Sequence, residues 1–169
     1  LNIKTGELQN YKRPENDGNS VSNYVWSIRG GENGDVWAAT ESGLIRFQNN
    51  DINNPTVYTL LEFQETPKSF MRSNDIYSDG KGNVFIATYG AGILKYNSKE
   101  DTFTRLKLKT GDVEFPISAN VQGLFLDSRG WLWIATIKNG LFVYDHKKNY
   151  VRQFLNDPLD STSINDNKI

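Results

Sequence analysis

The chain of 169 residues contains no cysteine, one histidine, one methionine and five prolines. Without cysteine, disulfides and thiolate chemistry are excluded, and cysteine usage gives no information on the redox compartment. Basic and acidic side chains nearly balance, at 19 against 20, so the chain has no surplus of positive charge to displace the counterions of a nucleic acid. We therefore expect no nucleic-acid partner.

Long hydrophobic runs are also lacking. The longest, at residues 131–135, is far too short to span a membrane. The start of the chain shows no basic stretch followed by the apolar stretch of an export signal. The sequence therefore predicts no membrane segment within this chain. Because 37% of the residues are hydrophobic, the chain nevertheless has too many apolar groups for a disordered protein.

What the chain does contain is a repeat with a period of 48 residues. Each copy has a glycine, an apolar run with Trp or Phe, and an Ala-Thr pair. A second glycine then opens another apolar and aromatic run, and the first copy has one residue fewer before that glycine than the other two copies. The three copies of the first part are GDVWAAT at 34–40, GNVFIAT at 82–88 and GWLWIAT at 130–136.

Each repeat is predicted to form four short strands, since β-branched and aromatic runs alternate with Gly, Asn and Asp. No window of a dozen residues keeps a 3.6-residue apolar period, so helices should be few. Both faces of the second strand are apolar at 36–39 and 132–135, which requires cover on both sides. We therefore predict an all-β fold of four-stranded antiparallel β-propeller blades. A β-sandwich would not explain the constant repeat.

Dividing the length by the period gives about three and a half repeats, fewer than a closed propeller needs. We therefore expect a β-propeller fragment whose open terminal blades expose apolar faces and favour self-association. The expected division is 1–22 for the end of a preceding blade and a connection, 23–60, 74–106 and 120–155 for three blades, 61–73 and 107–119 for inter-blade connections, and 156–169 for a connection and the first strand of the next blade.

Residues that could suggest catalysis have simpler interpretations. His146 lies in a charged turn and has neither the spacing of a metal ligand nor an orienting partner. The glycines at 90–92 precede a strand instead of a helix, so they do not form a phosphate-binding loop. Residues 79–83 resemble a calcium loop but lack its closing glutamate. We expect no catalytic residue, no metal site and no cofactor.

Ligand-binding residues are expected in variable loops at one rim, where the turns between second and third strands meet the inter-blade connections. Trp37, Phe85 and Trp133 share one repeat position and should pack between blades, whereas Trp26 and Trp131 are aromatic in one repeat only. An oligosaccharide needs aromatic faces for its rings and polar side chains for its hydroxyls. The candidate ligand-binding residues are Arg72, Asn74, Tyr89, Lys138 and Asn139.

The motif DSRGWLWIAT at 127–136, the following GLFVY and the loop at 156–161 resemble the two-component regulator propeller repeat. The resemblance extends over nearly the whole chain. Gly31 departs from it, because Asp79 and Asp127 occupy that position in the other copies, and Ala precedes the threonine in all three copies where the family often has Gly. Such repeats form the periplasmic sensor region of hybrid two-component histidine kinases, notably those of gut Bacteroidetes that detect products of polysaccharide breakdown.

The resemblance implies a non-enzymatic, periplasmic sensor segment that responds to an oligosaccharide and regulates its utilisation. Its implied partners are the remaining propeller blades and the histidine kinase of the parent protein. Two alternatives stay open. The chain could be a structural propeller scaffold for dimer or interdomain contacts, with ligand bound elsewhere. It could also be a lyase-like enzyme, since propeller lyases that inactivate streptogramin antibiotics use histidine, but a single His146 does not supply their site.

Overall fold

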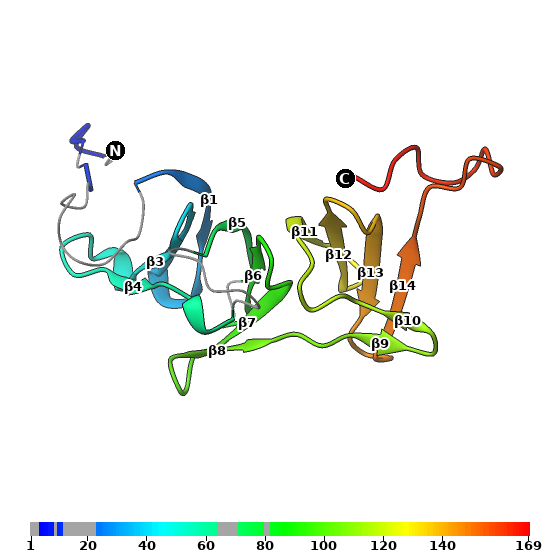
Figure 1. Ribbon diagram of the computed structural model, residues 1–169. Coiled ribbons are helices and arrows are strands. Elements are labelled where there is room, and N and C mark those ends of the chain that lie inside the picture. The colour runs from blue at the N-terminus through cyan, green and yellow to red at the C-terminus, as the bar shows by residue number, and fades with distance from the viewer. Residues whose placement is uncertain (1–3, 9, 12–22, 64–70, 80–81) are drawn as a thin grey trace.

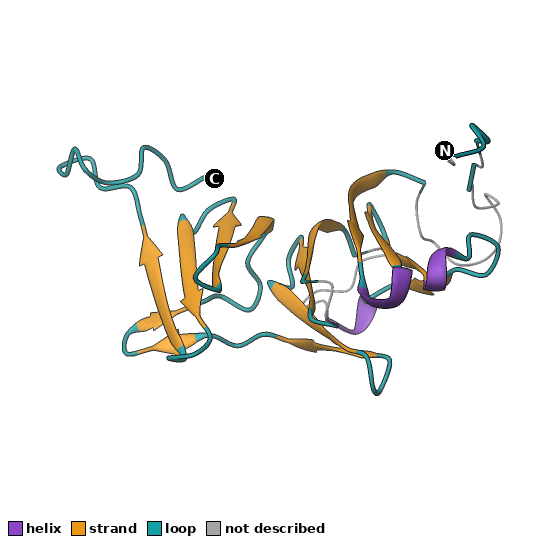
Figure 2. Cartoon of the chain, turned by 180° about the vertical axis from the view of Figure 1, so that it is seen from behind, coloured by secondary structure: helices purple, strands orange, loops and turns teal. Residues whose placement is uncertain are grey.

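A computed structural model of the chain describes residues 4–8, 10–11, 23–63, 71–79 and 82–169. Strands dominate this part of the chain, as Figure 2 shows. The helical segments found among these residues are three 3-10 turns, η1 (Glu32–Gly34), η2 (Gln48–Asn50) and η3 (Leu61–Phe63). The prediction of an all-β chain with few helices is confirmed. The predicted end of a preceding blade falls on residues 1–22, most of which lie outside the described residues.

Three four-stranded antiparallel sheets follow one another along the chain. The first contains β1 (Val25–Gly30), β2 (Val36–Thr40), β3 (Gly43–Phe47) and β4 (Thr56–Tyr58); the second contains β5 (Ser73–Ser78), β6 (Val84–Thr88), β7 (Ile93–Asn97) and β8 (Thr102–Arg105); the third contains β11 (Val121–Leu126), β12 (Trp131–Thr136), β13 (Leu141–Asp145) and β14 (Tyr150–Phe154). Within each sheet the strands pair in chain order. We call these sheets the first, second and third blades.

The blades lie side by side in a row, from the first at one end of the molecule to the third at the other (Figure 1). Their first strands form one inner edge, because β5 contacts β1 on one side and β11 on the other. Four-stranded meanders packed face to face around such an edge are blades of a β-propeller. The predicted fold, a propeller fragment of four-stranded antiparallel blades, is confirmed.

The repeated Ala-Thr and Gly residues close the turn between the second and third strands. In the first blade, the Thr40 hydroxyl donates a 3.0 Å hydrogen bond to the Gly43 carbonyl and accepts one from the Ser42 N–H. The same pair of bonds occurs in the other two blades, and all three threonines are fully buried. The glycine is required because Gly43 has φ +135°, and a Cβ there would collide with the Tyr58 carbonyl oxygen.

The two larger clusters of the hydrophobic core lie between the blades, and a smaller cluster around Ala38 and Ile45 lies on the first blade. One cluster joins the first and second blades around Trp37, which is 1% exposed. A second cluster joins the second and third blades, where Phe115 and Phe142 meet edge to face at 5.1 Å between ring centroids. Trp37 therefore packs between blades as predicted, while its equivalents Phe85 and Trp133 are only half-buried.

The connection before the third blade is more ordered than an irregular linker. It contains a two-stranded hairpin of β9 (Lys109–Thr110) and β10 (Val113–Glu114) that contacts β14. The Thr110 hydroxyl accepts a 2.9 Å hydrogen bond from the Val151 N–H, and this bond fastens the hairpin to the blade. Strands of two residues are too short to produce a periodic sequence pattern, so the sequence did not predict them.

The segment at 156–169, predicted to include the first strand of a next blade, forms turns, and no strand follows Phe154 in the described chain. It runs back to the third blade, where the Ile169 N–H donates to the Thr136 carbonyl at 2.9 Å and the Gly140 N–H donates to the Asn167 carbonyl at 2.9 Å. Ile169 stands 48 residues after Val121, the first residue of β11. Ile169 therefore occupies the repeat position of Val121.

Candidate functional site

Each blade carries a β-bulge at the same place in its first strand. The pairing register of the first strand with the second shifts between Val25 and Ser27, and the equivalent shift recurs in β5 and β11. A bulge leaves one residue out of the pairing and redirects its side chain. The three residues at these shifts are Trp26, Asn74 and Gln122.

These bulged residues line one open groove of about 610 Å³ that crosses the inner strands of all three blades. Trp26 gives the groove an aromatic wall and is 51% exposed. The amide of Gln122 and the charged groups of Arg29 and Asp75 supply polar partners, and Asn74 also lines the groove. The groove thus offers one aromatic face beside several hydrogen-bonding groups, an arrangement suited to a polyhydroxylated ring.

Asp75 fixes the position of the three inner strands beneath the groove. Its Oδ1 accepts hydrogen bonds from the Ser27 hydroxyl at 2.7 Å and from Arg29 Nη2 at 3.2 Å, both on β1. Its Oδ2 accepts a bond from the Leu124 N–H on β11 at 3.1 Å. One carboxylate on the middle blade therefore holds both neighbouring blades.

Trp26 is held in place by a cluster at the rim of the groove. The guanidinium carbon of Arg72 lies 4.1 Å from the centre of the Trp26 ring and 5.7 Å from that of Tyr89. Glu41 completes the cluster, because its Oε2 accepts a 2.9 Å hydrogen bond from Trp26 Nε1 and lies 3.7 Å from Arg72 Nε. A planar guanidinium stacked on an aromatic ring restricts that ring, so Trp26 presents its exposed surface in a defined orientation.

Asn74 holds a buried, unsatisfied acceptor beneath the groove. Its side chain is 8% exposed, and its Nδ2 donates a 2.6 Å hydrogen bond to the Val121 carbonyl. Its Oδ1 is buried without a hydrogen-bond partner in the part of the chain that the structure describes. Buried polar atoms are nearly always paired, so a donor that reached Oδ1 after a small shift of this side chain would be stabilised.

The structure brings three of the five predicted site residues together. Arg72 and Tyr89 meet at the rim of the groove, and Asn74 lines it. Lys138 and Asn139 lie instead in the turn of the third blade and do not line the groove. There the Asn139 N–H donates to Thr136 Oγ1, and its carbonyl accepts a bond from Gln153 Nε2, both at 2.9 Å.

Sequence reasoning did not select Arg29, Asp75 or Gln122, and it singled out Trp26 without placing it among the candidates. A signal for these residues exists in the repeat itself. Positions 26, 74 and 122 are spaced by 48 residues and carry a different side chain in each copy. A repeat position whose side chain differs in every copy is one that the scaffold does not dictate, and the next position, with Ser27, Asp75 and Gly123, also differs in every copy.

The opposite rim carries the only histidine. His146 is exposed, and its Nδ1 lies 3.1 Å from the Gly130 carbonyl oxygen. Among the described residues, His, Asp and Glu side chains form no cluster of three or more that could hold a metal ion. A search of the same residues found no helix of the length and apolarity needed to cross a membrane.

Fold and groove together define a segment of a β-propeller with an open groove along its inner strands. Comparison with known proteins agrees on the fold. No protein-family model matches the sequence, and no curated protein matches it. Solved structures do match, and the chain aligns with only about a fifth of the length of two of them.

These two are described as extracellular domains of the hybrid two-component systems BT3049 and BT4673 from B. thetaiotaomicron. BT3049 is 22% identical with a TM-score of 0.66, and the match covers 87% of this chain and 20% of that one. BT4673 is 20% identical with a TM-score of 0.67, covering 86% and 18%. Virginiamycin B lyase from Staphylococcus aureus is 15% identical with a TM-score of 0.55, covering 79% and 43%. At these identities the likeness shows a shared fold.

Proposed function

We propose that this chain is a ligand-recognition segment of the periplasmic sensor propeller of a hybrid two-component histidine kinase, and that its groove takes an oligosaccharide whose utilisation the kinase regulates. The observation that carries the proposal is the row of bulged residues, Trp26, Asn74 and Gln122, across three blades. The fold likeness to extracellular domains of two-component systems supports it.

The proposed recognition follows from the groove chemistry. One sugar ring would lie on the exposed surface of Trp26, since aromatic rings accept the apolar face of a pyranose. Its hydroxyls would bond to Gln122, to Arg29 and to the unpaired Oδ1 of Asn74. We place no catalytic step here, because the groove is lined by no histidine and the chain's single histidine lies at the other rim.

Signalling would rest on the way the groove crosses blades. A ligand that contacts β1, β5 and β11 together binds more tightly when those strands keep one spacing. Because the ligand has a higher affinity for that spacing of the strands than for others, its binding shifts the sensor toward the arrangement of blades that has this spacing. The remaining blades and the kinase of the parent protein would transmit that shift.

Isothermal titration calorimetry with a panel of hexasaccharides tests the proposal: maltohexaose, xylohexaose, mannohexaose and hexagalacturonate. We expect at least one to bind, and Trp26→Ala and Gln122→Ala to weaken that binding by about tenfold or more. Lys148→Ala, an exposed change at the opposite rim, is the matched control. Lys138→Ala and Asn139→Ala show whether the ligand extends along the rim. No binding by the panel, or equal affinity in Trp26→Ala and the control, contradicts the proposal.

A scaffold role has its own supporting observation. Ile28, Ile76 and Leu124 occupy equivalent positions of the three inner strands, yet Ile28 is 59% exposed while the other two are 0% and 7% exposed. Phe125 on the third blade is 64% exposed. Ile28 and Phe125 are therefore exposed on apolar faces of the first and third blades. Exposed apolar faces of this kind favour contact with another blade or with a second copy of the chain. We therefore propose self-association as a second property of this chain.

A further inference from the structure

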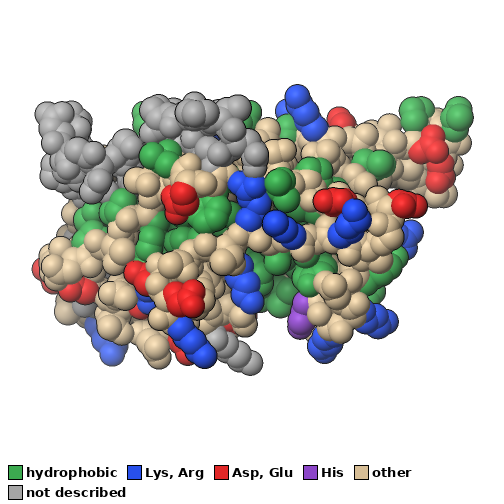
Figure 3. Space-filling model, turned by 60° about the horizontal axis from the view of Figure 1, so that its bottom comes forward, with side chains coloured by type: hydrophobic (Ala, Val, Ile, Leu, Met, Phe, Trp, Pro, Cys, Tyr) green, Lys and Arg blue, Asp and Glu red, His purple; other side chains and the backbone are tan. Residues whose placement is uncertain are grey.

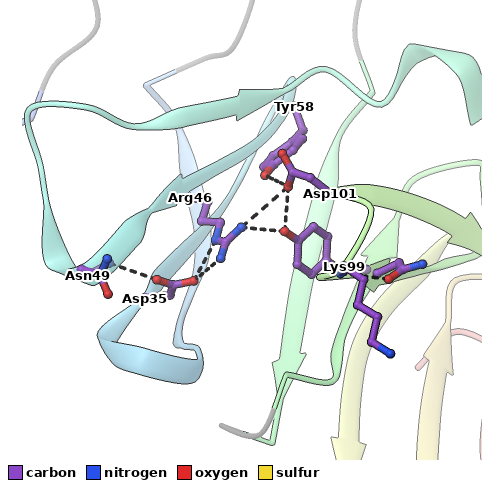
Figure 4. A network of polar contacts seen from close by, with 8 residues as sticks. Asp35, Arg46, Asn49, Tyr58, Lys99 and Asp101 are labelled. Carbon is purple, nitrogen blue, oxygen red and sulfur yellow. Dashed lines mark hydrogen bonds and ion pairs between the residues drawn. The ribbon is translucent and has the colours of Figure 1, made fainter.

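The two junctions between blades are built from equivalent positions but are filled differently. At the first junction, Arg46 on β3 forms the centre of a polar network (Figure 4). Its Nη2 lies 2.6 Å from Asp35 Oδ2, and its Nη1 donates a 2.6 Å hydrogen bond to the Tyr96 hydroxyl and lies 3.7 Å from Asp101 Oδ1. Two carboxylates and one phenol therefore surround this guanidinium.

Aromatic rings fill the rest of the first junction. Trp37 stacks on Tyr58 at 5.9 Å and meets Tyr96 edge to face at 4.8 Å between ring centroids. Phe103 packs against all three rings. Because Trp37 is 1% exposed, little room remains between the first and second blades at this place.

At the second junction, the 48-residue repeat puts smaller or uncharged side chains at the same positions. Phe85 replaces Trp37, Leu106 replaces Tyr58 and Lys95 replaces Arg46. Asn83 and Asn149 replace the two carboxylates, Asp35 and Asp101, and Tyr144 stands in the place of Tyr96. Leu126 and Leu132, which are larger than their equivalents Ser78 and Val84, make up only part of the lost volume.

The result is a cavity of about 260 Å³ between the second and third blades. Its walls are apolar and aromatic, and its polar side chains are those of Tyr77, Asp79, Asn83, Lys95, Tyr144 and His146. Figure 3 brings the lower face of the molecule forward, where basic side chains are gathered over the middle and hydrophobic side chains are exposed between them. The cavity belongs to the end of the blades opposite the groove, because Asn83 and His146 lie at the β5–β6 and β13–β14 turns.

The charge at this cavity also differs from that of the first junction. Lys95 has no carboxylate within ion-pair distance among the described residues, and its ammonium lies 5.7 Å from the Phe85 ring centre. Asp79 is close by, but its two oxygens accept hydrogen bonds from the Asn83 N–H at 3.1 Å and from Asn83 Nδ2 at 2.7 Å. The second junction therefore lacks an aromatic ring and an anionic group relative to the first.

We propose that this cavity binds a small aromatic anion. The ring of the ligand would take the place that the larger side chains of Trp37 and Tyr58 fill at the first junction, against Phe85, Leu106 and Leu132. Its carboxylate would face Lys95, as Asp35 and Asp101 face Arg46. Since the site shares no lining residue with the groove, this proposal does not depend on the oligosaccharide.

Phenylacetate is a suitable probe, with phenylacetamide as its neutral counterpart, and saturation-transfer NMR with competition gives both affinities. We expect phenylacetate to bind at least about fivefold more tightly than the amide. Lys95→Met should remove that preference while the amide affinity stays unchanged. Lys148→Ala, which lies outside the cavity, is the control and should leave both affinities unchanged.

Rebuilding the first junction at the second provides the decisive variant. The combined changes Asn83→Asp, Phe85→Trp, Lys95→Arg and Leu106→Tyr should abolish phenylacetate binding while circular dichroism shows an intact fold. Phe85→Trp alone is the smaller change and should weaken phenylacetate binding by about tenfold. If wild-type protein fails to bind phenylacetate, binds both probes equally, or binds phenylacetate as tightly after Phe85→Trp, the proposal is wrong.

Discussion

Ser27 and Asp75 occupy the same position of successive repeats and are bonded directly to each other, at 2.7 Å between Ser27 Oγ and Asp75 Oδ1. The third copy of this position is Gly123, beside which the Leu124 N–H donates to Asp75 Oδ2. A Cβ on Gly123 would lie 3.8 Å from that oxygen. The Asp75 carboxylate thus connects the Ser27 hydroxyl of the first blade to the Leu124 N–H of the third blade.

Replacing Asp75 should weaken the whole inner edge. Asp75→Ala removes the acceptor for Ser27, for Arg29 and for the Leu124 N–H, so we expect the free energy of unfolding to fall by about 2–4 kcal/mol. Ser27→Ala removes one of these bonds and should cost about 1 kcal/mol. Urea denaturation followed by tryptophan fluorescence measures both. Equal losses in the two variants would show that Asp75 does not join the blades.

The acid side of the stability profile should depend on Asp101. The Asp101 carboxylate accepts hydrogen bonds from the hydroxyls of Tyr58 and Tyr96, each 2.7 Å long. The bond from Tyr58 has the larger effect, and together the two hold the pKa of this carboxyl below its usual 3.8. Since the unfolded state binds the proton more readily, the stabilisation is fully present above about pH 4 and is lost as pH falls through the lower, folded-state pKa. Asp101→Asn should therefore make unfolding less dependent on pH below about pH 4.

Urea midpoints across the acid range, compared with those of the exposed control Asp112→Asn, test this expectation. The alkaline side provides an independent check on the same network. Burial, followed by the hydrogen bond to Asp101, raises the pKa of Tyr96 to about 12. That contribution is complete below the ordinary value of 10 and is lost as pH rises toward 12. Parallel acid profiles for the two Asn variants would contradict the assignment to Asp101.

The turn glycines should tolerate substitution very differently from one another. Gly43 and Gly111 both have positive φ, but a Cβ on Gly43 would collide with the Tyr58 carbonyl oxygen, whereas Gly111 has open space around it. We expect Gly43→Ala to lower the free energy of unfolding by more than about 3 kcal/mol and Gly111→Ala by about 1 kcal/mol. Thermal and urea unfolding give the comparison. Similar losses would mean that only backbone conformation matters at Gly43.

Part of this architecture could be predicted from the sequence because the repeat imposes it locally. The Thr and Gly of each copy recur since the hydroxyl of Thr40 and its equivalents closes the same turn on the same glycine. The argument that variable loops meet at one rim named Arg72 and Tyr89, and the Arg72 guanidinium carbon lies 5.7 Å from the centre of the Tyr89 ring. These features depend on residues that are close in sequence or placed by the blade itself.

The bulges and the cavity could not be predicted in the same way. Whether Trp26 is bulged depends on the register of β1 against β2, which the residues of β1 alone do not determine. Substitutions such as Tyr58 to Leu106 can be found by aligning repeats, but the space they leave depends on Leu126 and Leu132 of the next blade. The volume between two blades depends on contacts between residues that are far apart in the sequence.

Exposed faces of the outer blades carry a prediction about association. Leu44 and Ile93, at equivalent positions of the first two blades, are fully buried, whereas Leu141 of the third blade is only half-buried. Phe125 lies in the same uncovered region, since both line one hollow with Trp133. Burying one such side chain contributes about 1.5–3 kcal/mol, so covering this face by a second copy is favourable.

We therefore expect reversible self-association that strengthens from low to high micromolar concentration. Phe125→Lys should weaken it by placing a charge in the apolar face, because a buried unpaired charge is strongly unfavourable. Leu159→Lys is the matched control, since Leu159 is 96% exposed in a turn. Sedimentation velocity distinguishes the variants. A monomer at every concentration, or equal effects of the two lysines, would show that these faces do not pair, because an association driven by apolar burial must respond to where the charge is placed.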